Sequence, residues 1–207
     1  MNTKKGLYLF GFFVLVGVSI FFWKSGIFEP KLEPITFSNE KYPEYRQQIA
    51  KRMNAKTQKI TDYPVVPGSW DYTDPSDIEI ALVDLNDDQI PEVLALIGSR
   101  YYSSGVGGIQ FEIYSQTKEE LKSIVAVAGR VNDKPCRLYG FGVQTSSHIA
   151  KSHHKTNGYY DLCWFWETLH PQNDRKHFLV WRDGSYDYGK SEKIRDAERG
   201  VFPDENL

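Results

Sequence analysis

The chain of 207 residues has little cysteine and none of the short motifs that carry the commonest enzyme chemistry. Its two cysteines form no C-x-x-C pair, which leaves no basis for a thioredoxin-like or zinc-knuckle site. The sequence also lacks H-E-x-x-H and G-x-S-x-G, so it has neither a zinc-protease helix nor a serine-hydrolase elbow. These absences predict a protein that is not an enzyme.

A large excess of basic residues is absent as well. Beyond residue 24 the chain has 22 Lys and Arg residues against 27 Asp and Glu residues, because Lys4, Lys5 and Lys24 account for the other three basic ones. Binding to nucleic acid needs many Lys and Arg side chains to replace phosphate counterions. The charge balance therefore argues against a nucleic-acid partner.

One long apolar run begins near the N-terminus. Residues 6–23 carry no charge and are bounded by Lys5 and Lys24. As a helix this run is about 27 Å long, which is close to the thickness of the hydrocarbon core of a bilayer. A cleaved signal peptide is the alternative, but its apolar core is usually about 7–15 residues and ends at small residues, which are missing here. We therefore predict an uncleaved transmembrane anchor over residues 1–24.

The lysines beside this run predict its orientation. Lys4 and Lys5 precede the run, and basic flanks favour the cytoplasmic side of a membrane. The prediction is a single-pass protein of the inner (cytoplasmic) membrane whose C-terminal domain lies in the periplasm or outside the cell. We expect an extended linker over 25–40, an extracytoplasmic β-rich domain over 41–190 and a polar tail over 191–207.

Hydrophobic spacing within the domain predicts one amphipathic helix followed by about seven short strands. The helix covers about 42–56, and its apolar face consists of Tyr42, Tyr45, Ile49 and Met53. Short apolar runs separated by turn signals then indicate strands at 78–83, 92–97, 109–114, 121–127, 137–143, 159–166 and 178–181, with a return at 185–188 after Asp183-Gly184. The expected fold class is α+β, mainly antiparallel β, in a sheet or a partly closed barrel.

The segment Asp84–Glu92 has the oxygen spacing of a calcium loop. Oxygen-bearing side chains stand at its first, third, fifth and ninth positions, and a backbone carbonyl at the seventh completes the set. Calcium takes about six to eight oxygen ligands, and a tight turn can gather them. The candidate ligands are Asp84, Asn86, Asp88, Ile90 and Glu92.

This loop resembles the D-x-N-x-D-x-x-P-E loop of the FG-GAP and VCBS repeat families. Segments 155–162 and 179–186 look like elements that accompany such loops in small secreted or periplasmic bacterial proteins, so the resemblance covers about 77–188. Asp87 and Gln89 stand where the families usually have glycine, and a left-handed conformation at Gln89 would cost energy. The alternative to a calcium site is a polar turn in which Asp84 and Asn86 bond to the local backbone.

The cysteines and one aromatic loop give two further candidate sites. A disulfide between Cys136 and Cys163 would close a loop of about 28 residues and contribute about 3 kcal/mol. Two buried thiols are the alternative. For recognition we predict the loop that contains Tyr101, Tyr102, Ser103 and Ser104, because aromatic residues on loops often bind partners.

The histidines indicate no metal site. His148, His153 and His154 fall in a polar stretch that reads as an exposed loop, without the converging ligands that zinc needs. A hydrolase in which His148, His153 and Asp161 converge in the fold is kept as an alternative.

The leading functional hypothesis is a membrane-anchored binding module for a protein or a cell-envelope polymer outside the cytoplasm. An inhibitor, an immunity protein or a chaperone would fit this description. A calcium-dependent adhesion or sensing domain is the second hypothesis, and an envelope hydrolase is the third. The first hypothesis predicts a stoichiometric partner. The second predicts calcium-dependent melting, and the third predicts a pocket in which the hydrolase residues meet.

Overall fold

The computed structural model describes residues 31–98, 108–117, 120–125, 128–131, 134–137, 143–144, 149–166 and 175–194. The chain from Leu32 onward forms one compact unit, and the residues up to Lys31 belong to another. The anchor predicted over 1–24 lies outside the described residues, and no helix within them is long and apolar enough to cross a membrane. The anchor therefore remains a prediction from the sequence.

The described residues contain one α-helix, one short 3-10 helix and twelve strands. The helices are α2 (Pro43–Gln58) and η1 (Pro75–Asp77). The strands are β1 (Leu32–Pro34), β2 (Ile78–Val83), β3 (Glu92–Ile97), β4 (Gly108–Gln116), β5 (Leu121–Ser123), β6 (Ala128–Val131), β7 (Lys134–Arg137), β8 (Val143–Gln144), β9 (Ile149–Thr156), β10 (Tyr159–Trp166), β11 (Arg175–Arg182) and β12 (Ser185–Lys193).

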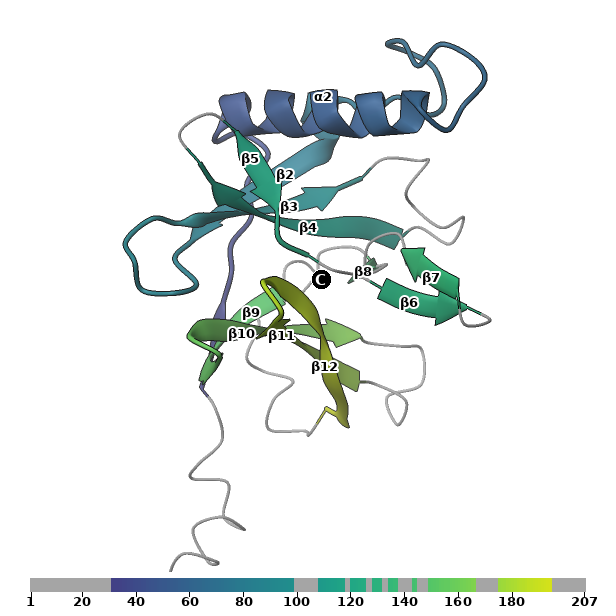
Figure 1. Ribbon diagram of the computed structural model, residues 1–207. Coiled ribbons are helices and arrows are strands. Elements are labelled where there is room, and N and C mark those ends of the chain that lie inside the picture. The colour runs from purple at the N-terminus through teal and green to yellow at the C-terminus, as the bar shows by residue number, and fades with distance from the viewer. Residues whose placement is uncertain are drawn as a thin grey trace, which may run out of the picture. The chain divides into compact units, whose positions relative to one another are not determined.

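Most of the strands belong to two antiparallel sheets (Figure 1). The first sheet has the order β2-β3-β4-β5, and β8 also pairs with β4. The second has the order β1-β9-β10-β11-β12, while β6 and β7 form a separate hairpin. The predicted fold, one helix with mainly antiparallel strands, is confirmed. The strands do not share one sheet as expected, and those in the described part of the chain close no barrel.

Strand β3 explains why a second sheet is needed. All six of its residues are buried, so both faces of the first sheet are covered. One face packs against α2 in a cluster that includes Ile49, Met53, Ile80, Val93, Ala95 and Ile97. The other face shares a cluster with the second sheet that includes Leu94, Leu96, Phe111, Leu162, Leu179 and Tyr186. The domain therefore has three layers, in the order α2, first sheet, second sheet (Figure 1).

Helix α2 lies as its hydrophobic spacing predicts. Ile49 and Met53 are buried, and Tyr42 and Tyr45 pack against the same cluster. Proline at the first helical position, Pro43, suits the start of a helix because no N–H is needed there. The side of α2 that faces away from the sheet carries polar and basic residues.

Two tight turns connect the strands of the second sheet. Asn157 and Asp183 have φ values of 51° and 49°, and the glycines that follow them, Gly158 and Gly184, have φ values of 89° and 81°. Two successive residues with positive φ are the signature of the hairpin turn whose twist matches that of the strands. The hairpin predicted at Asp183-Gly184 is confirmed.

The prediction of an exposed loop around His148–His154 was wrong from Ile149 onward. Ile149–Thr156 is strand β9, which pairs with β1 and β10 inside the second sheet. The buried side chains of this strand include Ala150 and Ser152, which are too small or too polar to give a clear apolar alternation. Strand β1 also shows that the predicted linker becomes part of the domain at Leu32.

Only the two ends of the strand predicted at 137–143 are described. Arg137 is the last residue of β7, which pairs with β6, and Val143 is the first residue of β8. Residues 138–142 lie outside the described residues, so this strand remains a prediction.

Candidate functional site

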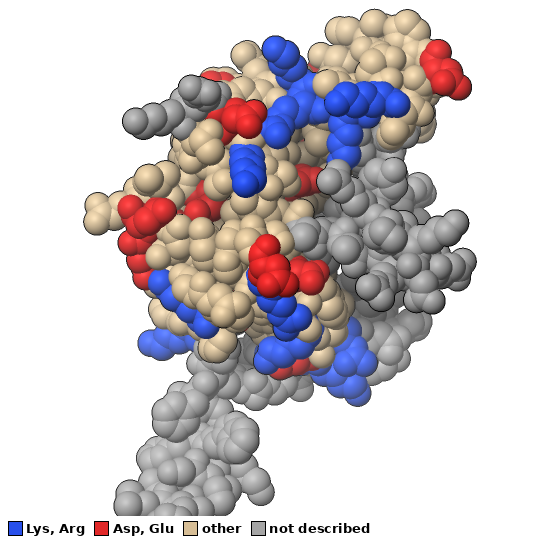
Figure 2. Space-filling view, in the orientation of Figure 1, with Lys and Arg blue, Asp and Glu red and all other residues tan. Residues whose placement is uncertain are grey.

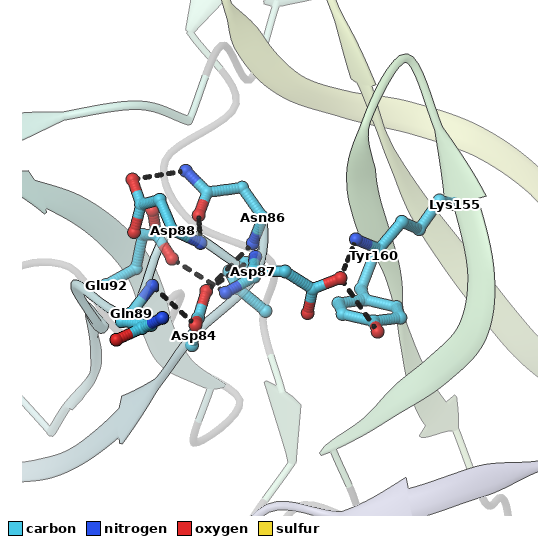
Figure 3. A network of polar contacts seen from close by, with 9 residues as sticks. Asp84, Asn86, Asp87, Asp88, Gln89, Glu92, Lys155 and Tyr160 are labelled. Carbon is cyan, nitrogen blue, oxygen red and sulfur yellow. Dashed lines mark hydrogen bonds and ion pairs between the residues drawn. The ribbon is translucent and has the colours of Figure 1, made fainter.

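The loop between β2 and β3 is closed by its own hydrogen bonds (Figure 3). The Asp84 carboxylate accepts backbone N–H groups from Asn86 at 3.2 Å, Asp87 at 2.7 Å and Gln89 at 3.0 Å. Partial desolvation acts to raise the pKa of Asp84, but these backbone donors outweigh it and hold the pKa below its ordinary value. Asp84 therefore works as the cap that fixes the turn.

Two residues of this loop adopt the left-handed backbone conformation, which costs energy for residues other than glycine. Asp87 has φ 65° and Gln89 has φ 67°, at the positions where the FG-GAP and VCBS loops usually have glycine. The backbone therefore has positive φ at both positions without glycine. The three N–H groups held by Asp84 offset the steric cost of these two conformations.

Most of the predicted calcium ligands take part in hydrogen bonds within the loop. Asn86 Oδ1 accepts the Asp88 N–H at 3.0 Å, and Asn86 Nδ2 donates to Asp88 Oδ2 at 2.9 Å. Asp88 Oδ1 accepts the Ile90 N–H at 2.7 Å. No group of three or more His, Cys, Asp or Glu side chains that could hold a metal occurs among the described residues. These oxygens accept hydrogen bonds from within the loop, and calcium binding remains a prediction from the sequence.

The ninth position, Glu92, holds the loop in a different way. Its side chain is buried and accepts the Leu85 N–H at 2.8 Å. Burial raises the pKa of Glu92 to about 6, and the nearby carboxylates of Asp88 and Asp84 add to the rise, while the Leu85 hydrogen bond opposes it. Glu92 is therefore a structural carboxyl whose charged form is disfavoured.

The same loop also docks onto the hairpin of β9 and β10. The Asp87 side chain points away from the turn and pairs with the Lys155 ammonium, and Tyr160 Oη donates to it at 3.3 Å (Figure 3). The hydrogen bond from Lys155 is the main reason that the pKa of Asp87 lies below its ordinary value. The backbone N–H of Tyr160 donates to the Leu85 carbonyl at 2.7 Å. Segments 84–92 and 155–162, which the family resemblance linked, are thus in contact and join the two sheets.

The hydrolase residues are only partly brought together. Asp161 is buried in β10, and its partner is His154, whose Nδ1 lies 2.7 Å from Asp161 Oδ2. His153 is exposed, and His148 lies outside the described residues. An open depression of about 290 Å³ lies between the edge strands β1 and β2, with Glu33 and Lys151 in its lining, but neither His153 nor Asp161 lines it.

Two other predicted sites lie wholly or partly outside the described residues. The loop with Tyr101, Tyr102, Ser103 and Ser104 is one of them. Cys163 is fully buried in β10, whereas only the backbone of Cys136 is described, in β7. The disulfide remains a prediction.

A second candidate site lies directly after α2 in the chain. The sequence did not predict it. Large apolar side chains are exposed at six positions of the described residues, and four of these fall within residues 60–70. The four are Ile60 at 54%, Tyr63 at 51%, Val66 at 51% and Trp70 at 69% of full exposure. Single exposed apolar residues are ordinary, so their grouping within this short segment sets the segment apart. The residues 60–73 are called loop 60–73 below.

Two side chains of α2 hold loop 60–73 in place. Asn54 Nδ2 donates to the Thr73 carbonyl at 3.0 Å, and Asn54 Oδ1 accepts the Thr73 N–H at 2.7 Å. Gln58, one turn further along the helix, donates to the Tyr63 carbonyl at 3.1 Å and accepts the Val65 N–H at 2.8 Å. Because residues four apart lie on the same side of a helix, both amides face the loop.

A third contact fixes the aromatic side chain itself. The Tyr63 hydroxyl donates to the carboxylate of Asp71, a buried residue near the far end of the loop. The loop is therefore ordered by side chain to backbone bonds and presents its apolar residues outward. The signal in the sequence is a loop marked by Pro64, Pro67 and Gly68 that contains several large apolar residues.

Comparison with protein-family models, with curated proteins and with solved structures finds no match for this chain. The resemblance to FG-GAP and VCBS loops therefore rests on the sequence alone.

Proposed function

We propose that this chain is a membrane-anchored, non-catalytic recognition module that binds a protein partner outside the cytoplasm through loop 60–73. The observation that carries the proposal is the set of four exposed apolar side chains on a loop that α2 holds in one conformation. The anchor predicted over 1–24 supports the location, and an inhibitor, an immunity protein or a chaperone is the kind of role that follows.

The residue types of the loop suit protein recognition. Trp and Tyr bury a large area at a small cost in side-chain entropy, and they are the residues that most often dominate binding energy at protein interfaces. Tyr63 and Trp70 are 51% and 69% exposed, so each side chain presents apolar surface to the solvent.

The order of the loop supports the same proposal. A binding loop that is mobile loses conformational freedom when a partner binds, and this loss subtracts from the affinity. Asn54 and Gln58 fix the backbone of loop 60–73 at both of its ends before any partner arrives. A loop that only connected α2 to the next element would not need these hydrogen bonds.

Photo-cross-linking in the cells that produce the protein tests the proposal. A photoreactive amino acid replaces Val66, whose side chain is exposed and whose backbone carbonyl, which accepts the Ser69 N–H, is kept by the substitution. The matched control places the same amino acid at His153, an exposed residue of the second sheet. We expect one discrete adduct from position 66, with a mass that corresponds to one partner protein, and none from position 153.

A second variant separates binding from folding. Trp70→Ser removes the largest exposed apolar surface without touching the buried clusters, so the domain should fold and the adduct should be lost. Adducts that are equal at positions 66 and 153, or an adduct that survives Trp70→Ser, would contradict the proposal.

A further inference from the structure

Basic residues gather on the helix that carries loop 60–73. The segment 41–59 has six basic residues and one acidic residue, although acidic residues are in excess over the chain beyond residue 24. Figure 2 shows Lys and Arg side chains gathered on the surface around α2. The basic residues of this segment are Lys41, Arg46, Lys51, Arg52, Lys56 and Lys59.

Helix stability explains only part of this gathering. A cation in the last turn of a helix offsets the negative end of the helix dipole, which accounts for Lys56. Lys51 lies in the middle of α2 and gains nothing from the dipole. Lys51 and Lys59 are exposed, and neither forms an ion pair with any residue in the described part of the chain.

The basic surface is continuous in sequence with the apolar one, because Lys59 directly precedes Ile60. We infer that the partner of loop 60–73 is an acidic protein segment that also carries apolar or aromatic side chains, and that α2 holds its carboxylates while the loop holds its apolar groups. This inference rests on the function proposed above and adds the chemistry of the partner.

A lipid surface fits the same charges less well. Asp62 is exposed between Ile60 and Tyr63, so the loop cannot enter the hydrocarbon region of a bilayer without carrying a carboxylate with it. A protein surface can accommodate Asp62 at the solvated rim of the interface, where charges cost little.

The test measures binding of a fluorescent Glu–Tyr copolymer and of polyglutamate of the same length to the full chain in detergent micelles. Both polymers offer carboxylates, and only the first offers aromatic rings. At about 50 mM salt we expect the copolymer to bind at least about fivefold more tightly than polyglutamate, and both affinities to fall as salt screens the charges.

Two double variants of equal charge change assign the contribution of α2. Lys51→Glu with Lys59→Glu should weaken binding of both polymers about tenfold, since rim charges act through attraction at a distance. Lys122→Glu with Lys193→Glu, at exposed positions of β5 and β12, is the matched control and should leave binding nearly unchanged.

The outcomes distinguish the inference from the proposed function. If Trp70→Ser removes the preference for the copolymer but the α2 variant binds as the control does, loop 60–73 remains the recognition surface and the acidic partner is overturned. If Trp70→Ser leaves the preference intact, the proposed function fails. Empty phosphatidylglycerol nanodiscs that displace the copolymer would assign the patch to a membrane surface and overturn the inference as well.

Discussion

Replacing Asn54 by alanine should release loop 60–73 from α2 without unfolding the domain. The Asn54 amide satisfies both the N–H and the C=O group of Thr73, which is fully buried. Alanine has no polar group to replace these two bonds, and water has poor access to a buried backbone. The far end of the loop would then open more often, while the packing of Ile49 and Met53 against the sheet is unchanged.

The size of the effect follows from the number of bonds lost. A hydrogen bond of this kind contributes about 0.5–1.5 kcal/mol net, so two of them hold the loop closed by about 1–3 kcal/mol. Since about 1.4 kcal/mol is a factor of ten in an equilibrium constant, the open fraction should rise by a factor of about 5–150. Global stability should fall by less, because Asn54 is only half-buried and belongs to neither apolar cluster.

Hydrogen exchange followed by mass spectrometry measures the opening of the loop directly. We expect peptides from 60–73 in Asn54→Ala to exchange about 5–150 times faster than in the parent chain, with peptides from β3 unchanged. Asn54→Asp is the matched control, because its carboxylate still accepts the Thr73 N–H but no longer donates to the carbonyl. Its effect should lie between those of the parent chain and the alanine variant.

Two results would contradict the role of Asn54 in holding loop 60–73. One is unchanged exchange in 60–73 together with a large loss of global stability, which would place Asn54 in the core instead of the loop framework. The other is identical exchange in the aspartate and alanine variants, which would mean that the hydrogen bond from the Thr73 N–H does not help to hold the loop closed.

Three further predictions concern the sheets and the loop between them. Because the folded-state pKa of Glu92 is raised to about 6, the folded protein binds this proton more tightly than the unfolded chain does, and the charged carboxyl costs stability as the pH rises from about 4.5 through 6. Glu92→Gln, which keeps an acceptor for the Leu85 N–H, should therefore gain stability relative to the parent chain over that range in urea titrations, and a constant difference would contradict the role of burial. Gly184→Ala should destabilise the β11–β12 hairpin by about 1–2 kcal/mol, since its φ of 81° is strained for a side chain, and an unchanged urea midpoint would count against the turn. Asp84→Ala should lower the melting temperature equally in 1 mM calcium and in chelator. A decrease in melting temperature that occurs only with calcium would support a calcium site in this loop.

The sequence predicted most accurately those elements whose pattern is local and strong. The strands 78–83, 92–97 and 159–166 were expected with the bounds that the structure has, because each is a short apolar run with a turn beside it. The hairpin at Asp183-Gly184 followed from two residues that tolerate positive φ. Strand β9 was missed because its buried positions are filled by residues such as Ser152, so its place in the sheet depends on its neighbours.

The division into two sheets could not be read from single strands. It depends on β3 being covered on both faces, and the burial of one strand is decided by chain segments far away in the sequence. The 84–92 loop illustrates a similar limit. The spacing of Asp84, Asn86 and Asp88 predicted side-chain oxygens around a cation, but the same oxygens can bond to the backbone, and spacing alone does not separate these two uses.

Loop 60–73 was missed because the exposure of its side chains cannot be read from the sequence. Its apolar residues were visible in the sequence, but only the structure shows that Trp70 and Tyr63 are exposed and that Asn54 and Gln58 hold the loop in place. Exposure is a property of the whole fold, whereas amino-acid type gives only the average tendency toward burial.

The yield of the cross-link from position 66 in living cells, compared between the parent chain and Trp70→Ser, decides whether loop 60–73 binds a partner. We expect one discrete adduct with the parent chain and its loss in the variant, at equal amounts of folded protein. A yield that is the same in both chains, or no adduct above that from His153, would contradict the claim that loop 60–73 is the recognition surface.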